Sequence, residues 1–328
     1  MLYYTIKADG KKAGRFENVV VGEEMGPFTY PVDDYSVKAY SFAVDDYSPW
    51  YYTDNNPFGK RIAHASFPCN DCLSIFLTVF EPSGVMGLHT EEEIWFHNPI
   101  FVGEDVTISA KIVDKFEKRG KGHWCFETKL VGEDGRPIID TRSTEIMHFE
   151  ASELTEEKKA KITGAVVTGE YDKTKAPVKK GTADVTPGTP LVSLTKIFHP
   201  EQAQIYSWVG QHFKNIHDNL AYAKEAGYDN LVVQGMQQLG CMCELLTDFY
   251  DANWFTSGHL KMKMIRTVLV GETITFHAVV KSVEKENDRN KVHLDVWTLN
   301  EKGQMTTIIR LGKRLRGLIY SKNTSIDL

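Results

Sequence analysis

The sequence lacks a hydrophobic run of the length that a helix needs to cross a bilayer. Its first residues, Met1 to Lys7, also lack the basic region, apolar segment and small-residue cleavage site of a secretory signal peptide. The 5 cysteines are an odd number, so they cannot all pair within the chain. These absences predict a cytoplasmic, reducing location and no membrane partner.

Positively charged residues are also fewer than negatively charged ones. The chain carries 38 Lys and Arg residues against 44 Asp and Glu residues, and its formal net charge at pH 7 is −6. This balance argues against nucleic acid as a partner, because no overall attraction to a polyanion remains. With 328 residues, of which 42% are hydrophobic and 25% charged, the chain has the size and composition of two ordinary globular domains.

Motifs for phosphate loops, dinucleotide binding, zinc proteases and serine nucleophile elbows are missing. Cys69 and Cys72 have a spacing that occurs in zinc and redox sites, but they lie in an apolar helical pattern without a second ligand pair nearby. Cys241 and Cys243 would point to different faces of a helix. We therefore expect no metal site and no cofactor.

What the sequence does contain is an internal repeat. The turn Val102–Glu104 returns as Val270–Glu272, and the turn at Gly135 returns at Gly303. In both cases the corresponding glycines are 168 residues apart. A register that is kept over such a distance predicts one structural unit used twice.

Each copy shows the same succession of elements, one apolar helix followed by three β-rich runs that turns separate. The expected helices cover 69–80 and 236–249, and the expected strands cover 104–114, 122–131 and 136–148, then 272–282, 291–299 and 304–313. A helix followed by a long antiparallel sheet predicts an α+β architecture in which the sheet wraps around the helix. Linker composition between the copies sets the predicted limits at 1–150, 151–190 (linker) and 191–328.

The stretch from Tyr206 to Met236 resembles the motif of MaoC-type hydratases, which reads Y-A-x-x-x-G-D-x-N-P-x-H, then Tyr-Ala, then G-F, and ends in H-G-M. The matching residues are Tyr206, His217, Tyr222, Ala223, Gly227, Gly235 and Met236. The first copy carries the same skeleton from Tyr40 to Tyr51, and His64 and Ala65 stand where the H-G pair lies. The resemblance implies a tandem (double) hot-dog fold, in which one half commonly works and the other shapes an acyl-CoA tunnel.

Neither copy holds the full set of motif residues. In the second copy His212 stands at the place of the family's Asp, and Lys214 stands at the place of its Asn. In the first copy Asp46 matches the family's Asp, whereas Tyr51 occupies the position of its His. Because the second copy keeps the histidine, we expect it to be the active half and the first copy to be degenerate.

Adding water to an α,β-unsaturated thioester requires a base for the water, a donor for the enolate oxygen and a proton for Cα. On the resemblance, His217 is the acid–base group, and the N–H of Gly235 at a helix N-terminus stabilises the enolate. His212 is expected to partner His217 in place of the family's carboxylate, with Asn215 orienting the water. The candidates for contact with substrate are Gln211, Asp218, Gln234, Asp46 and Tyr51, of which the last two also fit a purely loop-holding role.

The leading interpretation is a hydro-lyase that acts on an enoyl-CoA or 3-hydroxyacyl-CoA thioester, with coenzyme A present only as part of the substrate. A hot-dog thioesterase remains an alternative, because Asp71, Glu244 or Asp248 on the expected helices would supply the carboxylate that such enzymes use. A non-catalytic acyl-CoA-binding or partner subunit is the second alternative. Hot-dog proteins usually pair, so a homodimer is a further expectation.

Overall fold

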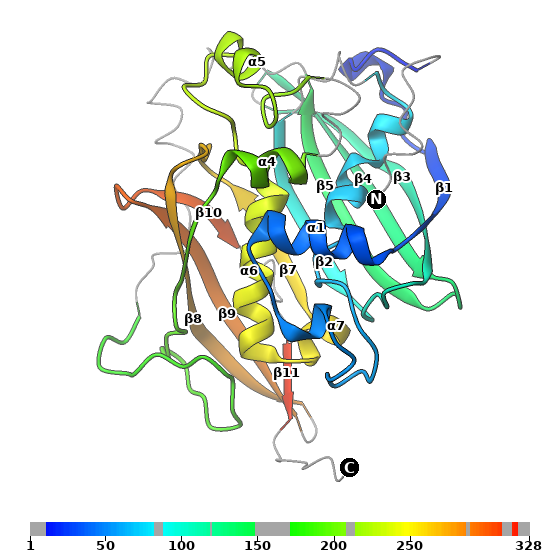
Figure 1. Cartoon of the computed structure of the whole chain (residues 1–328). Helices are drawn as coiled ribbons and strands as arrows, with labels where there is room; N and C mark the ends of the chain where they lie inside the picture. Colours follow the sequence, from blue (N-terminus) through cyan, green and yellow to red (C-terminus); the bar gives the residue numbers. More distant parts are fainter. Residues whose placement is uncertain are drawn as a thin grey trace.

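The computed structural model describes residues 11–81, 88–118, 120–147, 171–207, 214–286, 289–309 and 317–320. Figure 1 shows the strands of the first half (cyan to green) and those of the second half (orange) on either side of a group of helices. The helices α1, α4 and α6 lie between these two arrays of strands, so the molecule has a sheet that curves around its helices.

The first half begins with irregular and helical segments and continues with a meander of long strands. Its elements are η2 (Phe16–Asn18), β1 (Glu24–Pro31), α1 (Asp34–Val44), η3 (Pro49–Tyr51), α2 (Cys69–Ser74), η4 (Ile75–Thr78), β2 (Leu88–Phe96), β3 (Asp105–Lys118), β4 (Lys121–Gly132) and β5 (Pro137–Met147). The predicted helix over 69–80 is thus present, but it tightens into a 3₁₀ turn at Ile75.

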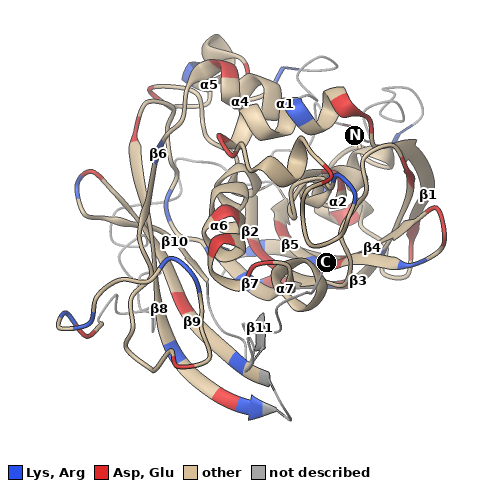
Figure 2. Cartoon of the chain, turned by 60° about the horizontal axis from the view of Figure 1, so that its bottom comes forward, with Lys and Arg blue, Asp and Glu red and all other residues tan. Residues whose placement is uncertain are grey.

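The second half repeats this order with a longer central helix. Its elements are β6 (Leu194–Ile197), α4 (Pro200–Tyr206), α5 (Leu220–Glu225), α6 (Gly235–Tyr250), α7 (Asn253–Ser257), β7 (His259–Met264), β8 (Thr273–Glu286), β9 (Arg289–Asn300), β10 (Met305–Ile309) and β11 (Gly317–Tyr320). Charges of both signs occur along the outer strands β8 and β9 (Figure 2).

All strands belong to one antiparallel sheet with the order β1-β3-β4-β5-β2-β7-β10-β9-β8-β6, and β11 pairs with β9. The two halves meet where β2 pairs with β7. The sheet therefore continues across the junction, and each half presents its inner face to a central helix, as the sequence pattern predicts.

The repeat is visible in the irregularities of the sheet as well as in its strands. A β-bulge lies between Ile112 and Asp114 in the pairing of β3 with β4, and another lies between Val280 and Ser282 in the pairing of β8 with β9. Each bulge residue is 168 positions from its counterpart. Gly103 and Gly271 have positive φ angles of 99° and 91°, a conformation that glycine adopts without steric cost. The duplication predicted from the sequence is therefore confirmed.

The helix α6 is buried along most of its length. Met236, Leu239, Met242 and Leu246 are each completely inaccessible to solvent. Helices of this kind gain their stability from packing rather than from local propensity. All five cysteines are buried free thiols, and those at 69 and 72 lie on α2, in the apolar helical pattern seen in the sequence.

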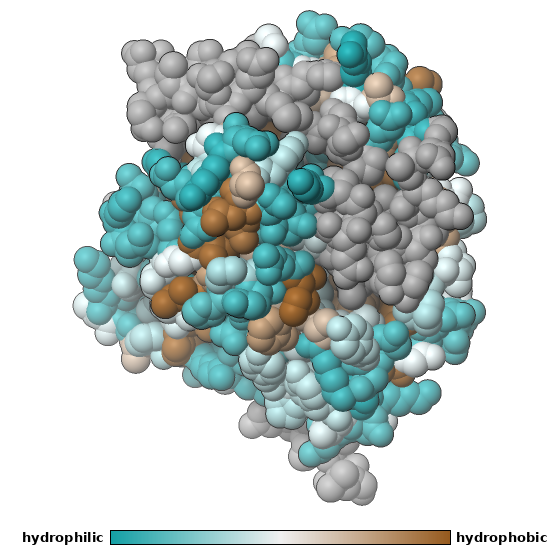
Figure 3. Space-filling view, turned by 45° about the horizontal axis from the view of Figure 1, so that its top comes forward, coloured by the Kyte–Doolittle hydropathy of each residue, from teal (hydrophilic) through white to brown (hydrophobic). Residues whose placement is uncertain are grey.

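The short helices α1 and α4 pack against each other on the sequence-equivalent tyrosines Tyr40 and Tyr206, whose ring centroids are 5.6 Å apart. A pocket of about 20 Å³ lies at this contact, and Asn70 and Asp71 also line it. Such a volume holds about one water molecule, so it is too small for a substrate. Ile205 and Leu220 are exposed apolar residues. Figure 3 shows hydrophobic patches on a surface that is otherwise mostly hydrophilic.

The described part of the predicted linker, from residue 171 onward, lies along the second half. The N–H of Gly181 donates to the carbonyl of Phe249 at 2.9 Å, and the N–H of Gly188 donates to the carbonyl of Val280 at 2.7 Å. Residues 151–170 lie outside the described residues, so the domain limits stay a prediction. Within the described ranges, no helix is long and apolar enough to cross a membrane.

Candidate functional site

The motif loop of the second half leads from α4 to the N-terminus of α6. Two of its predicted site residues, Gln211 and His212, lie outside the described residues. The remaining ones, Asn215, His217 and Asp218, are described and partly buried. The structure therefore shows how the second part of the motif is held against the central helix.

His217 is fixed by a single strong hydrogen bond of its ring. Its Nδ1 lies 2.7 Å from the carbonyl oxygen of Val232, which is two residues before the N-cap of α6. A carbonyl oxygen only accepts, so Nδ1 carries the proton and Nε2 is the unprotonated nitrogen. The N–H of Val232 in turn donates to the carbonyl of Ile216 at 3.0 Å, which ties the loop to this segment.

The electrostatic environment keeps His217 neutral. Loss of contact with water lowers the pKa of His217 to about 4, and the hydrogen bond to Val232 opposes this shift only in part. At neutral pH the ring therefore carries one proton on Nδ1. Among the described residues no group bonds to Nε2, so this nitrogen has the form that a general base requires.

Asn215 and Asp218 organise the loop around His217. The Oδ1 atom of Asn215 accepts the N–H of His217 at 2.8 Å, and its Nδ2 donates to Ser207 at 3.0 Å. Asp218 accepts the N–H of Asn215 at 3.1 Å. The carboxylate of Asp218 thus bonds within the loop, while the orientation of the imidazole comes from Val232.

The N-terminus of α6 is open at the position predicted for the oxyanion. Its N-cap is Gln234, and no side-chain hydrogen bond caps this end. Gly235 is the first helical residue and is partly exposed, which brings an N–H with no side chain beside it to the surface of the site. A Cβ atom at Gly235 would lie 3.1 Å from the Met264 side chain on β7.

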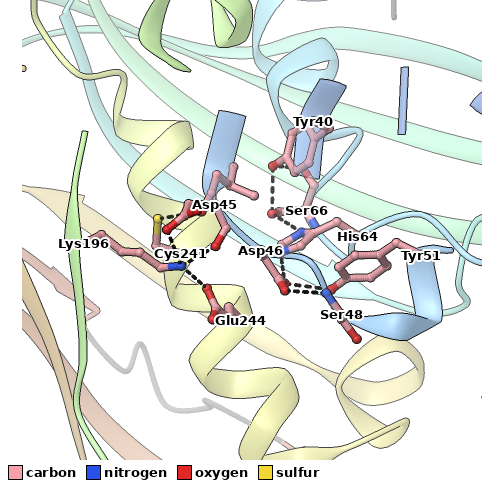
Figure 4. Close-up of polar contacts among 11 residues, drawn as sticks. Tyr40, Asp45, Asp46, Ser48, Tyr51, His64, Ser66, Lys196, Cys241 and Glu244 are labelled. Carbon is pink, nitrogen blue, oxygen red and sulfur yellow. Dashed lines mark hydrogen bonds and ion pairs between the residues drawn. The ribbon is translucent and has the colours of Figure 1, made fainter. Parts of the chain in front are cut away.

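The corresponding place in the first half is filled by a closed polar cluster, shown in Figure 4. The Tyr51 hydroxyl donates to Oδ2 of Asp46 at 2.9 Å, and Nε2 of His64 lies 3.2 Å from the same oxygen. Tyr51 is fully buried, and His64 and Asp46 are only 2% and 6% exposed. Burial acts to raise the pKa of Asp46, but His64, Tyr51 and the N–H of Ser48 together lower it below the ordinary value.

His64 and His217 therefore differ in whether a ring nitrogen is free to accept a proton. Nδ1 of His64 accepts the N–H of Ser66 at 3.1 Å, so its proton is on Nε2 and faces Asp46. Both nitrogens of His64 thus face partners inside the protein, whereas only one nitrogen of His217 is engaged. This contrast makes the second half the better candidate for chemistry.

His64 is the residue that the sequence argument did not select as a site candidate. It stands at the H-G place of the first copy, where it was noted only as part of the skeleton. Its contact with Asp46 joins two segments that are 18 positions apart, and the position of Asp46 in the motif was the one signal for it. The predicted pair of Asp46 and Tyr51 is brought together, in a buried location.

The carboxylates of the thioesterase alternative lie in three different environments. Glu244 on α6 forms an ion pair of 2.9 Å with Lys196 of β6, which also donates to the carbonyl of Asp45 (Figure 4). Burial, then the charge of Asp46, raises the pKa of Glu244 to about 7 although Lys196 acts against this. Asp248 is half-exposed beside a linker lysine, and buried Asp71 accepts the Tyr30 hydroxyl at 2.8 Å.

Two family models match the chain, one in each half. Residues 19–141 match the model described as FAS1-like, dehydratase domain region, and residues 172–308 match the model described as MaoC like domain. A comparison with curated protein sequences finds no match. Together the two models span most of the chain and both describe dehydratase-type units.

Solved structures with the same fold cover nearly the whole chain. A MaoC domain protein dehydratase from Chloroflexus aurantiacus has a TM-score of 0.71 at 9% identity and covers 96% of this chain and 100% of its own. A MaoC-like dehydratase from Phytophthora capsici has a TM-score of 0.62 at 14% identity, with 95% and 99% covered. A Mycobacterium tuberculosis protein described as having a double hotdog fold has a TM-score of 0.59 at 13% identity, with 90% and 95% covered.

These identities are low, so the solved structures establish the architecture, which is the predicted α+β double hot-dog fold. The family models add the class of protein, and they agree with the motif residues around His217 and with the repeat of 168 residues. The chain therefore combines a FAS1-like dehydratase region with a MaoC-like domain, and its fold is that of MaoC-like dehydratases.

Proposed function

We propose that the protein adds water to an enoyl-CoA thioester, or removes water from a 3-hydroxyacyl-CoA thioester, in its second half. The observation that carries this proposal is the state of His217, a neutral histidine whose Nε2 is free among the described residues and which is bonded to the segment that starts α6. A base and an open helix N-terminus thus lie together, as hydration of a thioester requires.

In the hydration direction, Nε2 of His217 takes a proton from water while the water oxygen bonds to Cβ. The electron pair of the double bond moves toward the thioester carbonyl, and the N–H of Gly235 donates to the resulting enolate oxygen. The proton on His217 then passes to Cα, which restores the base. Because the thioester and the helix N-terminus supply the activation, this proposal needs no metal or cofactor beyond the coenzyme A of the substrate.

The other predicted residues take supporting roles in this proposal. Asn215 fixes the backbone of His217, and Asp218 fixes Asn215. Gln234 lies beside the oxyanion position, and contact of His212 and Gln211 with water or substrate stays a prediction. In the first half, Asp46 and Tyr51 hold the wall next to α6 rather than reach the substrate.

A spectrophotometric screen of enoyl-CoA thioesters tests the proposal. The panel includes linear, branched, dicarboxylic and aromatic acyl groups, and each reaction is followed by loss of the conjugated absorbance and by release of free thiol. We expect loss of absorbance without thiol release, and no such loss with His217→Ala. Hydration that persists in the His217→Ala variant would refute the assignment of the base.

One observation keeps the thioesterase in view as a second candidate. Glu244 lies on the central helix with a pKa raised to about 7, a value suited to a general base. Thiol release from a saturated acyl-CoA that disappears in Glu244→Gln would select this function. If the chain binds acyl-CoA without either reaction, the non-catalytic subunit is the remaining candidate; cytoplasmic location and a homodimer stay predictions.

A further inference from the structure

The inner face of the sheet in the first half carries polar side chains where a hot-dog core is expected to be apolar. Glu92 on β2 and Ser143 on β5 are completely buried and stand opposite each other in the ladder. Thr141 and Glu145 on β5 are 1% and 3% exposed. We call these four residues, with His89 of β2, the inner polar stripe.

The fold itself does not require this stripe. Residues 168 positions along the chain are its counterparts in the second half, where Leu260 corresponds to Glu92 and Ile309 corresponds to Thr141. Both of these are fully buried apolar residues. Polar groups at the same places in the first half therefore reflect something specific to that half.

Several atoms of the stripe have no hydrogen-bond partner within the ranges that the structure describes. They are Nδ1 of His89, Oε1 of Glu92, Oγ1 of Thr141 and Oγ of Ser143. Within the same ranges, Nε1 of Trp124 on the neighbouring strand β4 is also buried without a hydrogen-bond partner. Buried polar groups of native proteins are almost always paired, because leaving one unpaired is costly. So many unpaired atoms on one inner face point to a bound polar group.

The stripe lies next to the proposed site in the second half. Met264 of β7 touches the position of Gly235, and Met262, two residues earlier on the same strand, stands opposite Glu92 across the junction of β7 with β2. β5 is the next strand beyond β2. With strands about 4.8 Å apart, the stripe is about one to two strand spacings from the strand that faces Gly235.

The stripe combines hydrogen-bond donors with acceptors. Nε2 of His89 bonds to Glu92 at 2.9 Å, and although burial acts to lower the pKa of His89, Glu92 raises it above its ordinary value. Burial raises the pKa of Glu145 to about 7. His89, the two hydroxyls and the indole N–H of Trp124 supply donors, whereas Oε1 of Glu92 and the hydroxyl oxygens supply acceptors.

We propose that the inner polar stripe receives the far end of the acyl group and that the substrate carries a hydroxyl group there. This inference rests on the proposed function, because it places the thioester at Gly235. An alkyl chain would leave the stripe unpaired, whereas an oxygen that accepts from Ser143 or Thr141 and donates to Glu92 satisfies it.

Binding of two saturated thioesters of equal size tests the inference apart from catalysis. Titration calorimetry compares ω-hydroxypentanoyl-CoA with hexanoyl-CoA in the full-length protein. We expect the hydroxylated ligand to bind at least about tenfold more tightly. In the double variant Ser143→Ala, Thr141→Val we expect this preference to fall to about parity, and in Thr144→Val, on the outer face of β5, to stay.

The outcomes separate the inference from the proposed function. Equal or tighter binding of hexanoyl-CoA, or a preference that the double variant retains, overturns the inference even if hydration is observed. A preference that depends on the stripe, in a protein that hydrates no enoyl-CoA, supports the inference and rejects the proposed reaction. Thermal unfolding controls for misfolding, since removal of unpaired buried hydroxyls should leave the melting temperature unchanged or higher.

Discussion

Glu93 of β2 and Lys261 of β7 stand directly opposite each other in the ladder that joins the two halves, and they are equivalent positions of the repeat, 168 residues apart. The pseudo-two-fold axis of the duplicated unit therefore passes between them. The side chains form an ion pair of 3.4 Å, and Lys261 also pairs with Glu91 at 2.6 Å. Opposite charges thus occupy positions where identical chains would place like charges.

Reversal of one of these charges should weaken the junction. We expect Glu93→Lys to lower the free energy of unfolding by about 1 kcal/mol, since a lysine would then face Lys261 and would lose the contact with His259. Denaturant titration measures the effect. The swapped double variant Glu93→Lys, Lys261→Glu should recover most of the loss, and a swap that adds to the loss would show that the pairing is irrelevant.

His217 of the second half and His64 of the first half should respond to substitution in opposite ways. His217→Ala should reduce hydration by about 10² to 10⁴-fold with a small change in stability, because it removes a base that has one free nitrogen. Steady-state kinetics on the best thioester of the panel and thermal unfolding measure the two effects.

The matched control is His64→Ala in the first half. It leaves the buried carboxylate of Asp46 without the imidazole that faces it, so we expect a loss of about 3 kcal/mol in the free energy of unfolding. The fraction that remains folded should keep a turnover close to the wild type. A catalytic defect in folded His64→Ala that exceeds the defect of His217→Ala would move the active site to the first half.

The pH dependence of hydration should follow His217. With a pKa of about 4, the ring stays neutral, with Nε2 unprotonated, from pH 7 down to about pH 5, and activity should fall only as the pH approaches 4. Initial rates over this range, with stability recorded in parallel, provide the measurement. A fall in kcat/KM centred near the ordinary histidine pKa of 6.5 would contradict the buried, desolvated state of the ring.

Stability should change with pH in the opposite sense because of two buried carboxyl groups. Glu145 and Glu244 have folded-state pKa values of about 7, above the ordinary value of 4.5. Between these values the folded chain holds more protons than the unfolded chain, so both groups lower stability as the pH rises from about 4.5 through 7. The double variant Glu145→Gln, Glu244→Gln should have a flatter melting temperature between pH 5 and pH 8.

Substitution of Gly235 should reduce activity without lowering stability. In Gly235→Ala the new methyl group meets only the flexible Met264 side chain, at 3.1 Å, but it stands beside the N–H offered to the thioester. We expect kcat/KM to fall at least about tenfold with an unchanged or higher melting temperature. Gly240→Ala is the control, because its methyl group would lie 2.4 Å from Val44 and should destabilise the chain.

The fold followed from the sequence to a large extent because its signals are local and occur twice. The same structural unit is predicted twice, by the turns at Gly103 and Gly271 and by the alternating strands after them. The motif near His217 then indicates which family this unit resembles. The apolar pattern over 69–80 did not reveal the change to a 3₁₀ turn at Ile75, because both helix types place apolar side chains at similar spacing.

The site was less predictable because its contacts join distant segments. The position of His217 in the motif indicated its importance, but its partner Val232 and the lowered pKa result from tertiary packing. No periodic sequence pattern indicates the contact of His64 with Asp46, or the pairing of Lys196 with Glu244 within the second half.

The continuous ladder between β2 and β7 has a consequence for how such a protein can change. In a dimer of identical chains every substitution arises at two places at once, so a residue that improves one site is imposed on the other. Here the junction lies within a single chain, and each position of one half can vary without its counterpart. Histidine at 217 with tyrosine at 51, or leucine at 260 with glutamate at 92, is an asymmetry that a dimer of identical chains cannot evolve.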